Sequence, residues 1–316
     1  MDHVKQSQQR GGENVAELWG QDYKVLPHIY PSNRSIIDID YQKECDCQDN
    51  HLNCLTAKEW VKRMPSVQEF QFEKRDIRDR LVHPATFPIS LATWGITLFT
   101  HRGELVVDPF AGVGTTLLSA RDTRRNAIGI ELQQKYADIT SGRLEDGNIL
   151  REMQCMVVDD ARHAAEYFAD ESISLILTSP PYADALNKPM GSKSYRHREQ
   201  QETTGVNINY SSDEKDLGTL RPEYWSYAIS DIFHNLREKV KSGGNVIVDI
   251  FDEAKDGKKY PLSKYVIDSM ESAGYEYRNC IIWDKRKLFS SLGIFGWPNN
   301  YLTVGTFNYL LHFRRK

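Results

Sequence analysis

The chain is predicted to fold as an α/β domain, with a doubly wound, mostly parallel sheet and helices on both faces. Two observations support this prediction. From about residue 81 to the end, short β-branched segments alternate with segments whose apolar residues recur at helical spacing. Such alternation favours a parallel sheet, and right-handed crossovers then place helices on both of its faces. At 316 residues and 40% hydrophobic content, the chain is long enough to bury a large core.

The expected elements follow this alternation along the chain. Thr56 can cap the first predicted helix together with Glu59, in a Thr-x-x-Glu capping box. The predicted strands are 104–110, 127–131, 156–159, 173–178, 245–251, 275–283 and 308–314. The predicted helices are 56–64, a buried amphipathic segment at 89–100, 115–121, a helix that ends at 143, 161–168, 223–240 and 264–273.

The chain divides by composition into two parts. Residues 1–80 are polar and mixed, and we expect an N-terminal extension that is a candidate for substrate recognition. Residues 81–316 form the main domain, with insertion loops at 183–222 and 285–305. The N-terminus has no apolar stretch after its charges, and no run of about 18 apolar residues occurs, so we expect a cytoplasmic protein without a signal peptide or membrane span.

Five cysteines at irregular spacing argue against a disulfide framework and for a reducing compartment. Cys45, Cys47 and Cys54 form a C-x-C-x6-C pattern with His51 between them. Three thiolates and one imidazole could hold zinc. However, the spacing is not that of a usual C-x2-C or C-x4-C knuckle and no second pair follows, so we expect free thiols and no metal.

A glycine-containing bend follows the first strand of the main domain, in the sequence DPFAGVGTT that begins at Asp108. Two glycines allow the backbone to turn sharply and to approach a ligand closely. The third glycine of a dinucleotide fingerprint is replaced by Leu117, and the carboxylate of Asp108 suits an ammonium group better than a pyrophosphate. Glu131 and Asp160 end the next two strands, where they could accept hydrogen bonds from ribose hydroxyls and from an adenine amino group.

A second bend, Ser179-Pro180-Pro181-Tyr182, ends the strand 173–178. The two prolines stiffen the loop and keep their carbonyls available as acceptors. A fixed acceptor and the Ser179 hydroxyl could hold the N–H groups of a base, and the Tyr182 ring could stack on that base. The alternative is a bend that proline stiffens for structural reasons alone.

Taken together, the segments DPFAGVGTT, AIGIE, VVDDA and TSPPY resemble those of the amino-methylating, S-adenosylmethionine-dependent DNA methyltransferases. Residues 83–88 and 308–314 resemble further parts of that family, and the likeness spans about residues 81–316. The resemblance implies a Rossmann-like sheet of seven strands with the last inserted antiparallel. It implies S-adenosylmethionine as cofactor, held by Thr86, Asp108, Phe110, Gly112, Gly114, Thr115, Glu131 and Asp160. It also implies a catalytic loop formed by Ser179, Pro180, Pro181 and Tyr182.

The resemblance further implies direct transfer of a methyl group to an exocyclic amino nitrogen of a flipped-out base in double-stranded DNA. Ser-Pro-Pro-Tyr is commoner in the cytosine-N4 enzymes, so N4 is the preferred target, in a restriction–modification or epigenetic context. Carbon-5 methylation needs a cysteine nucleophile, and no Pro-Cys pair occurs. Candidate DNA contacts, whose alternative is a solvated charged loop, are Lys188, Lys193, Arg196, Arg198, Lys285, Arg286 and Lys287.

Three alternatives stay open at this point: an adenine-N6 DNA enzyme, an RNA base methyltransferase, and a non-catalytic DNA-binding subunit. A cognate restriction endonuclease or a partner subunit is a candidate partner. The methyltransferase interpretation depends on one spatial expectation, namely that the bend after Asp108 and the bend at Ser179 face each other across a shared cleft.

Overall fold

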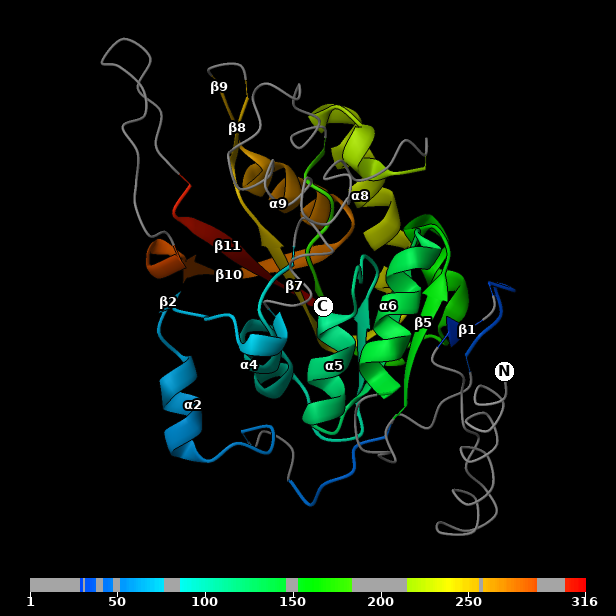
Figure 1. The fold of residues 1–316 in the computed structure, drawn as a ribbon, viewed down its shortest axis with the longest axis vertical. Helices are drawn as coiled ribbons and strands as arrows, with labels where there is room; N and C mark the ends of the chain where they lie inside the picture. Colours follow the sequence, from blue (N-terminus) through cyan, green and yellow to red (C-terminus); the bar gives the residue numbers. More distant parts are fainter. Residues whose placement is uncertain are drawn as a thin grey trace, which may run out of the picture.

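A nine-stranded sheet forms the centre of the molecule (Figure 1). The computed structural model describes residues 29–30, 32–37, 42–47, 52–76, 86–145, 153–183, 215–255, 258–288 and 305–316. Within these residues the strand order is β1-β5-β4-β3-β6-β7-β11-β10-β2. The five central strands are β3 (Leu105–Asp108), β4 (Asn126–Glu131), β5 (Gln154–Val158), β6 (Ile173–Thr178) and β7 (Val240–Ile250). All neighbouring pairs among these five are parallel, as the sequence predicted.

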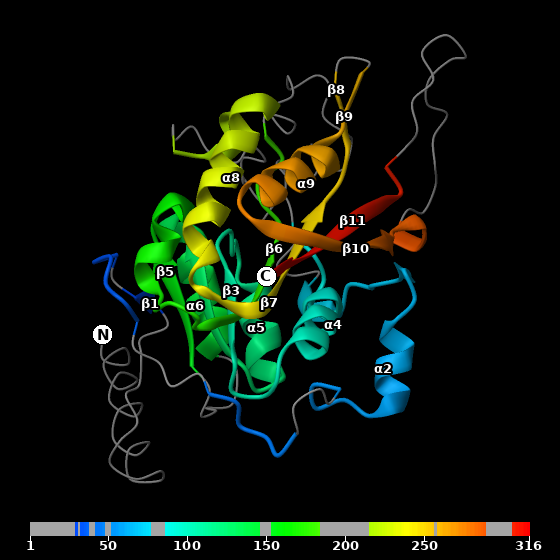
Figure 2. The ribbon, with the colours of Figure 1, turned by 180° about the vertical axis from the view of Figure 1, so that it is seen from behind.

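Helices cover both faces of this sheet. One layer is formed by α4 (Ile89–Phe99), α5 (Thr115–Asp122) and α6 (Gln134–Glu145) (Figure 1). The opposite layer is formed by η1 (Ala161–Tyr167), α8 (Pro222–Arg237) and α9 (Leu262–Ser272) (Figure 2). Successive residues of β3 alternate between the two layers: Val106 belongs to the core under α4–α6, whereas Leu105 and Val107 belong to the core under α8 and α9. The doubly wound fold class is therefore confirmed.

The end of the chain inserts as an antiparallel strand. β11 (Phe307–Arg315) lies between β7 and β10 (Tyr275–Asp284) and runs antiparallel to both. Its residues are mostly buried, with Leu310 and Phe313 fully so, because both edges and both faces of the strand are covered. This arrangement confirms the expected position of the last strand.

The expected count of seven strands is wrong for the described residues, because two more come from the N-terminal extension. β1 (Ile29–Tyr30) pairs with β5, and β2 (Val67–Gln68) pairs with β10. Each is two residues long, too short to show a period-2 pattern in the sequence. β8 (Glu253–Lys255) and β9 (Lys258–Tyr260) form a separate hairpin.

The described part of the extension is integrated into the main core. The helix α2 (Ala57–Arg63) begins with the expected capping box: Glu59 N–H donates to Thr56 Oγ1 at 3.3 Å, and Thr56 N–H donates to Glu59 Oε2 at 2.8 Å. Phe70 packs against Trp94 of α4, with ring centroids 5.6 Å apart. Residues before position 80 thus contribute strands and core side chains to the main domain. A functional boundary at residue 80 stays a prediction.

Two local expectations are corrected. The segment expected as a helix over 161–168 is the 3-10 helix η1, capped by the Asp160 carboxylate, which accepts from Arg162 N–H at 3.0 Å. The insertion loops contain two further short 3-10 helices, η4 (Leu217–Thr219) and η5 (Arg286–Leu288).

Among the described residues, no helix is long and apolar enough to cross a bilayer.

Acid should weaken the fold through His312 of β11. Burial lowers the pKa of His312 to about 4, and Asn279 donates to its Nδ1 at 3.3 Å while Nε2 faces Asn245 Oδ1 at 2.9 Å. Since the unfolded pKa is about 6.5, the contribution is fully present above that pH and is lost as pH falls through about 4, by up to about 3 kcal/mol. Urea unfolding at pH 7 and pH 4.5 should show a smaller difference for His312→Gln than for the unaltered chain; equal differences would contradict this role.

Candidate active site

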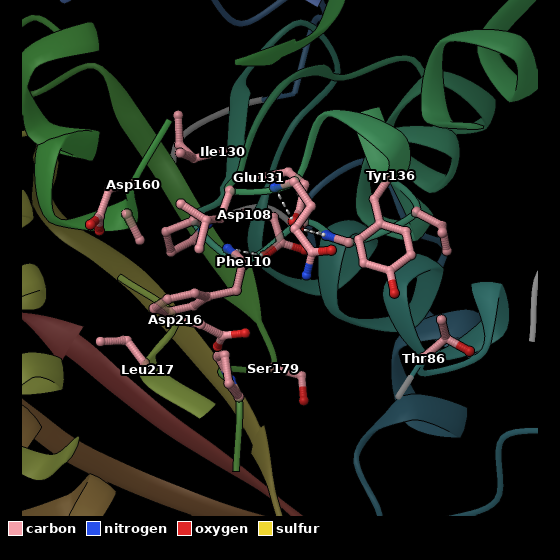
Figure 3. Close-up of a pocket in the computed structure, with 18 of the residues that line it drawn as sticks. Thr86, Asp108, Phe110, Ile130, Glu131, Tyr136, Asp160, Ser179, Asp216 and Leu217 are labelled. Carbon is pink, nitrogen blue, oxygen red and sulfur yellow. Dashed lines mark hydrogen bonds between the residues drawn. The ribbon is translucent and has the colours of Figure 1, made fainter. Parts of the chain in front are cut away.

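A cleft opens at the carboxyl ends of β3, β4 and β6 (Figure 3). The empty space between its walls is about 860 Å³, counting the part that is open to solvent. The bend after Asp108 contributes residues 108–113 and Thr115 to its lining, and the bend at Ser179 contributes Ser179 and Pro181. The two bends therefore share one cleft, and the spatial expectation on which the sequence interpretation depends is confirmed.

The glycine bend turns through left-handed backbone. Gly112 has φ 52° and Gly114 has φ 75°, and Gly114 is the N-cap residue of α5. A Cβ at Gly114 would lie 2.3 Å from Thr140 Cγ2, so a larger residue would clash as well as strain the backbone. The bend can therefore lie close to helix α6, which carries Thr140 behind the cleft.

Glu131 holds this bend from the neighbouring strand. Its Oε2 accepts from the Gly112 N–H at 2.9 Å, and its Oε1 accepts from the Gln133 N–H at 2.8 Å (Figure 3). Burial raises the pKa of Glu131 to about 7 despite these two hydrogen bonds. Each carboxylate oxygen has further lone-pair capacity, so Glu131 can also accept from a ligand in the cleft.

Asp108 connects the two bends. Its carboxylate accepts from Thr116 Oγ1 at 2.6 Å, from Thr178 Oγ1 at 2.6 Å and from the Phe110 N–H at 3.1 Å. Thr178 ends β6 directly before Ser179, so this carboxylate links the start of α5 to the second bend. Burial raises the pKa of Asp108 to about 6. Its expected role toward an ammonium group stays a prediction, and the structure adds a positioning role that the sequence did not reveal.

Helix α8 fixes the backbone of the second bend by a hydrogen bond. The Pro181 carbonyl accepts from Trp225 Nε1 at 2.7 Å and from the Ala183 N–H at 2.9 Å. The expectation that both proline carbonyls are available to a base is therefore corrected for Pro181. The reason is tertiary, because Trp225 lies 44 residues further along the chain.

The side chains of the second bend contact each other. Ser179 Oγ and Tyr182 Oη are 3.1 Å apart. Tyr182 is only 7% exposed, and its ring contacts the Phe251 ring edge to face, with centroids 4.7 Å apart. The hydroxyl groups of Ser179 and Tyr182 thus form one polar unit whose aromatic part is packed against the end of β7.

Asp160 lies on the far side of the cleft from Thr86 (Figure 3). Its carboxylate caps η1 and also pairs with Arg162, with Nη1 and Oδ2 2.6 Å apart. Thr86, Phe110 and Thr115 line the same cleft, so all eight expected cofactor contacts except Gly114 do so. Gly114 lies just behind the lining as the start of α5. Pro180 and Tyr182 belong to the second bend but do not line the cleft.

Some lining residues were missed in the sequence. Asp216 comes from the long stretch without periodicity, and Tyr136 comes from α6. Asp216 is 5% exposed, and its carboxylate accepts from the Gly218 N–H at 2.8 Å. The sequence Asp-Leu-Gly-Thr at this point is a recognisable turn signal, but it does not indicate that the turn faces a ligand.

The candidate DNA contacts are only partly described. Lys188, Lys193, Arg196 and Arg198 lie outside the described residues. Lys285, Arg286 and Lys287 follow β10, where Lys285 Nζ lies 5.2 Å from the centroid of the Phe251 ring. Arg286 pairs with Asp284 at 2.6 Å, and Lys287 pairs with Glu69 at 2.5 Å. The role of all seven basic residues stays a prediction.

The fold and the position of the cleft define a doubly wound α/β protein with its candidate site where such sheets bind ligands. Residues 2–141 match the family model N6_N4_Mtase, described as DNA methylase. These residues include the N-terminal extension, so the family likeness begins earlier than the expected residue 81.

Curated relatives agree with this match. Type II methyltransferase M.ScaI from Streptomyces caespitosus is 42% identical over 72 residues, 23% of this chain and 24% of the relative. Type II methyltransferase M.MthZI from Methanothermobacter thermautotrophicus is 29% identical over 131 residues, 38% of this chain and 37% of the relative. The chain therefore spans only about a quarter to two fifths of the length of these relatives.

Among solved structures, TrmN from Thermus thermophilus is similar over 76% of this chain and 52% of that chain, with 14% identity and a TM-score of 0.46. The family match and the curated relatives confirm the resemblance to the S-adenosylmethionine-dependent, amino-methylating DNA methyltransferases. They do not separate the cytosine-N4 from the adenine-N6 type. S-adenosylmethionine as the cofactor is supported by the same family match.

Proposed function

We propose that this chain is a site-specific DNA methyltransferase that transfers a methyl group from S-adenosylmethionine to an exocyclic amino nitrogen, with N4 of cytosine as the preferred target. One observation carries the proposal. The bend that the resemblance assigns to the cofactor and the bend that it assigns to the base line a single cleft at one edge of the sheet.

The charge of the cleft suits this cofactor. Four carboxylates line it, those of Asp108, Glu131, Asp160 and Asp216 (Figure 3). Lys215 is the one lysine among the described residues that line it. S-adenosylmethionine carries an ammonium and a sulfonium group, and both gain from nearby carboxylates. A pyrophosphate would be repelled by the same groups, so the lining also argues against a dinucleotide cofactor.

The residues around the cleft can hold the cofactor by separate groups. Glu131 would accept from the ribose hydroxyls while keeping the Gly112 bend in place, and Asp160 would accept from the adenine amino group. Asp108 would attract the ammonium group and keep the two bends in register through Thr116 and Thr178. When bound, S-adenosylmethionine supplies an activated methyl group on its sulfonium sulfur.

Ser179 would act on the acceptor. Its hydroxyl can accept an N–H of the base amino group, which directs the nitrogen lone pair away from that bond and into the cleft. The same oxygen would stabilise the positive charge that develops on the nitrogen. Tyr182 orients this hydroxyl at 3.1 Å, and Trp225 fixes the backbone of the bend through the Pro181 carbonyl.

The choice of cytosine N4 over adenine N6 follows from the residue at position 179. A neutral serine precedes the two prolines, the form that the resemblance associates with the cytosine-N4 type. None of the five cysteines lines the cleft, so the described residues offer no thiolate for a carbon-5 mechanism. The target base would be flipped out of double-stranded DNA into the cleft, with basic side chains such as Lys285 on the phosphates.

Transfer of a tritium-labelled methyl group from S-adenosylmethionine tests the proposal. Plasmid DNA and tRNA are offered to the purified chain separately, and the labelled products are digested to nucleosides. We expect label in N4-methyldeoxycytidine. Label in N6-methyldeoxyadenosine would change the target base, and transfer to tRNA alone would overturn the DNA assignment. Cofactor binding with no transfer to either would instead favour a non-catalytic subunit that acts with a partner chain.

A further inference from the structure

Three cysteines of the N-terminal extension meet one histidine of the main domain. Cys47 Sγ lies 3.6 Å from Cys54 Sγ, Cys45 Sγ lies 3.3 Å from His101 Nδ1, and Cys54 Sγ lies 3.7 Å from the same nitrogen. These four atoms all lie within 4.8 Å of one another, and all four residues are half-buried. The structure thus gathers three side chains that the sequence suggested would be separate free thiols.

The spacing matches tetrahedral coordination. With Zn–S bonds of about 2.3 Å and Zn–N bonds of about 2.0–2.1 Å, a tetrahedral site places two sulfurs about 3.8 Å apart and a sulfur and a nitrogen about 3.5 Å apart. The three separations between these ligand atoms, 3.3–3.7 Å, lie close to those values. A disulfide would need about 2.05 Å between sulfurs, far less than the 3.6 Å between Cys47 and Cys54.

We propose that Cys45, Cys47, Cys54 and His101 bind one structural zinc ion. Three thiolates and one imidazole complete a four-coordinate shell, which leaves no position for a substrate or a reactive water and is typical of structural sites. The histidine is His101, from the turn before β3, and not the neighbouring His51 that the sequence pattern suggested. His51 lies outside the described residues.

The surrounding contacts hold the four ligands together. The Glu44 N–H donates to the Arg102 carbonyl at 2.7 Å, and Asn53 Nδ2 donates to the Leu98 carbonyl at 2.5 Å. Gly103 has φ 81°, and a Cβ there would lie 2.3 Å from the Gln42 carbonyl oxygen. The segment that carries Cys45 and Cys47 is therefore pressed against the turn after α4, next to His101.

The charge around the cluster suits a zinc site with three thiolates, whose net charge is −1. Arg125 is 3% exposed, and its guanidinium donates to the Thr100 hydroxyl at 3.1 Å and to the Thr100 carbonyl at 2.7 Å. Burial lowers the pKa of Arg125, whereas negative charge on the Cys54 and Cys45 sulfurs would favour its charged form. Lys43 Nζ donates to the Cys47 carbonyl. A buried cation and a half-buried cation thus accompany the anionic site.

The position of the cluster indicates what the metal does. The turn at His101 precedes β3, at the amino end of that strand, whereas the cleft lies at the carboxyl ends of the strands. Figure 1 shows the blue segment that carries residues 42–47 along the lower end of the molecule, below α4 and α5. The zinc would therefore cross-link the extension to the main domain at a distance from the cleft, and it would stabilise the fold without entering the reaction.

Metal analysis of the purified full chain tests this proposal. The protein is prepared under reducing conditions without chelators, and we expect about one zinc per chain, with no iron or acid-labile sulfide. His101→Ala should lose most of this zinc. Two matched controls, His51→Ala and Cys280→Ser, should keep it. Zinc below about 0.2 per chain in the unaltered protein, iron with sulfide in its place, or equal loss in His51→Ala and His101→Ala would each overturn the assignment.

A second measurement covers the case in which His101→Ala does not fold. Cobalt(II) is added to the metal-stripped, unaltered chain, and thiolate-to-cobalt absorption with a tetrahedral visible spectrum is expected. His101→Cys should keep the metal as a four-sulfur site with a shifted spectrum. Stripping zinc from the unaltered chain should lower Tm by about 5 °C or more, reversed by zinc. Absence of the thiolate bands, or an unchanged Tm on stripping a zinc-loaded protein, would contradict the structural site.

Discussion

Replacing Glu131 by alanine should raise the dissociation constant for S-adenosylhomocysteine by about 100-fold. A hydrogen bond to a charged group contributes about 1.5–3 kcal/mol, and two ribose hydroxyls would lose their acceptor, so a loss of about 3 kcal/mol is expected. The Gly112 N–H, which donates to Glu131 at 2.9 Å, would lose its partner as well. Isothermal titration calorimetry measures the change directly, with Glu166→Ala, an exposed acid outside the cleft, as the control.

The pH dependence of S-adenosylhomocysteine binding gives an independent test of the role of Glu131. Burial raises the pKa of Glu131 to about 7, so the carboxylate predominates at pH 8 and the protonated acid at pH 6. Affinity should therefore fall between pH 8 and pH 6, since the protonated form loses acceptor capacity. Glu131→Gln should bind weakly with a flatter profile. Binding of Glu131→Ala within threefold of the unaltered chain would contradict the ribose role.

Ser179→Ala should lower turnover by about 100-fold while the dissociation constant of the cofactor changes by no more than about threefold. Loss of a single polar group that stabilises developing charge typically costs 10²–10³ in rate. The Ser179 hydroxyl is held at 3.1 Å from Tyr182 Oη, and it lines the cleft beside the cofactor bend. The measurement is single-turnover methyl transfer to plasmid DNA alongside calorimetry with S-adenosylhomocysteine.

Controls separate this effect from damage to the fold. Ser226→Ala removes a serine hydroxyl that donates to the Glu223 carbonyl on α8, outside the cleft, and should leave turnover unchanged. Tyr182→Phe keeps the packing against Phe251 and removes only the hydroxyl that orients Ser179, so an intermediate loss is expected. If Ser179→Ala instead abolished cofactor binding, or left turnover intact, the second bend would be misassigned.

Local signals predicted most of the elements and both bends. The capping box of Thr56, the β-branched run that forms β6 and the left-handed Gly114 each depend on residues close together in the chain. The alternation of strands and helices then indicated a parallel sheet, and in such a sheet the carboxyl ends of neighbouring strands meet at one edge. For that reason the shared cleft could be predicted without coordinates.

Contacts between distant residues could not be predicted in this way. Trp225 donates a hydrogen bond to the Pro181 carbonyl, and Thr178 donates one to Asp108, 70 residues earlier in the chain. Two-residue strands of the extension pair with the two edges of the sheet. None of these contacts leaves a periodic signal, because each depends on how whole elements pack. The identity of the residues that line the far side of the cleft, such as Asp216, was decided in the same way.

The sequence by itself determined the order of the seven main strands and of the helices between them, and the position of the two bends, because these follow from short-range backbone preferences and hydrophobic period. Only the tertiary structure decided which polar groups are already hydrogen-bonded and which side chains contact each other. His101, and not His51, meets the three cysteines because the turn after α4 packs on the segment 42–47. Cys54 and His101 are 47 residues apart in the chain. Contacts at such separations are set by how the elements pack, which local sequence patterns do not reveal.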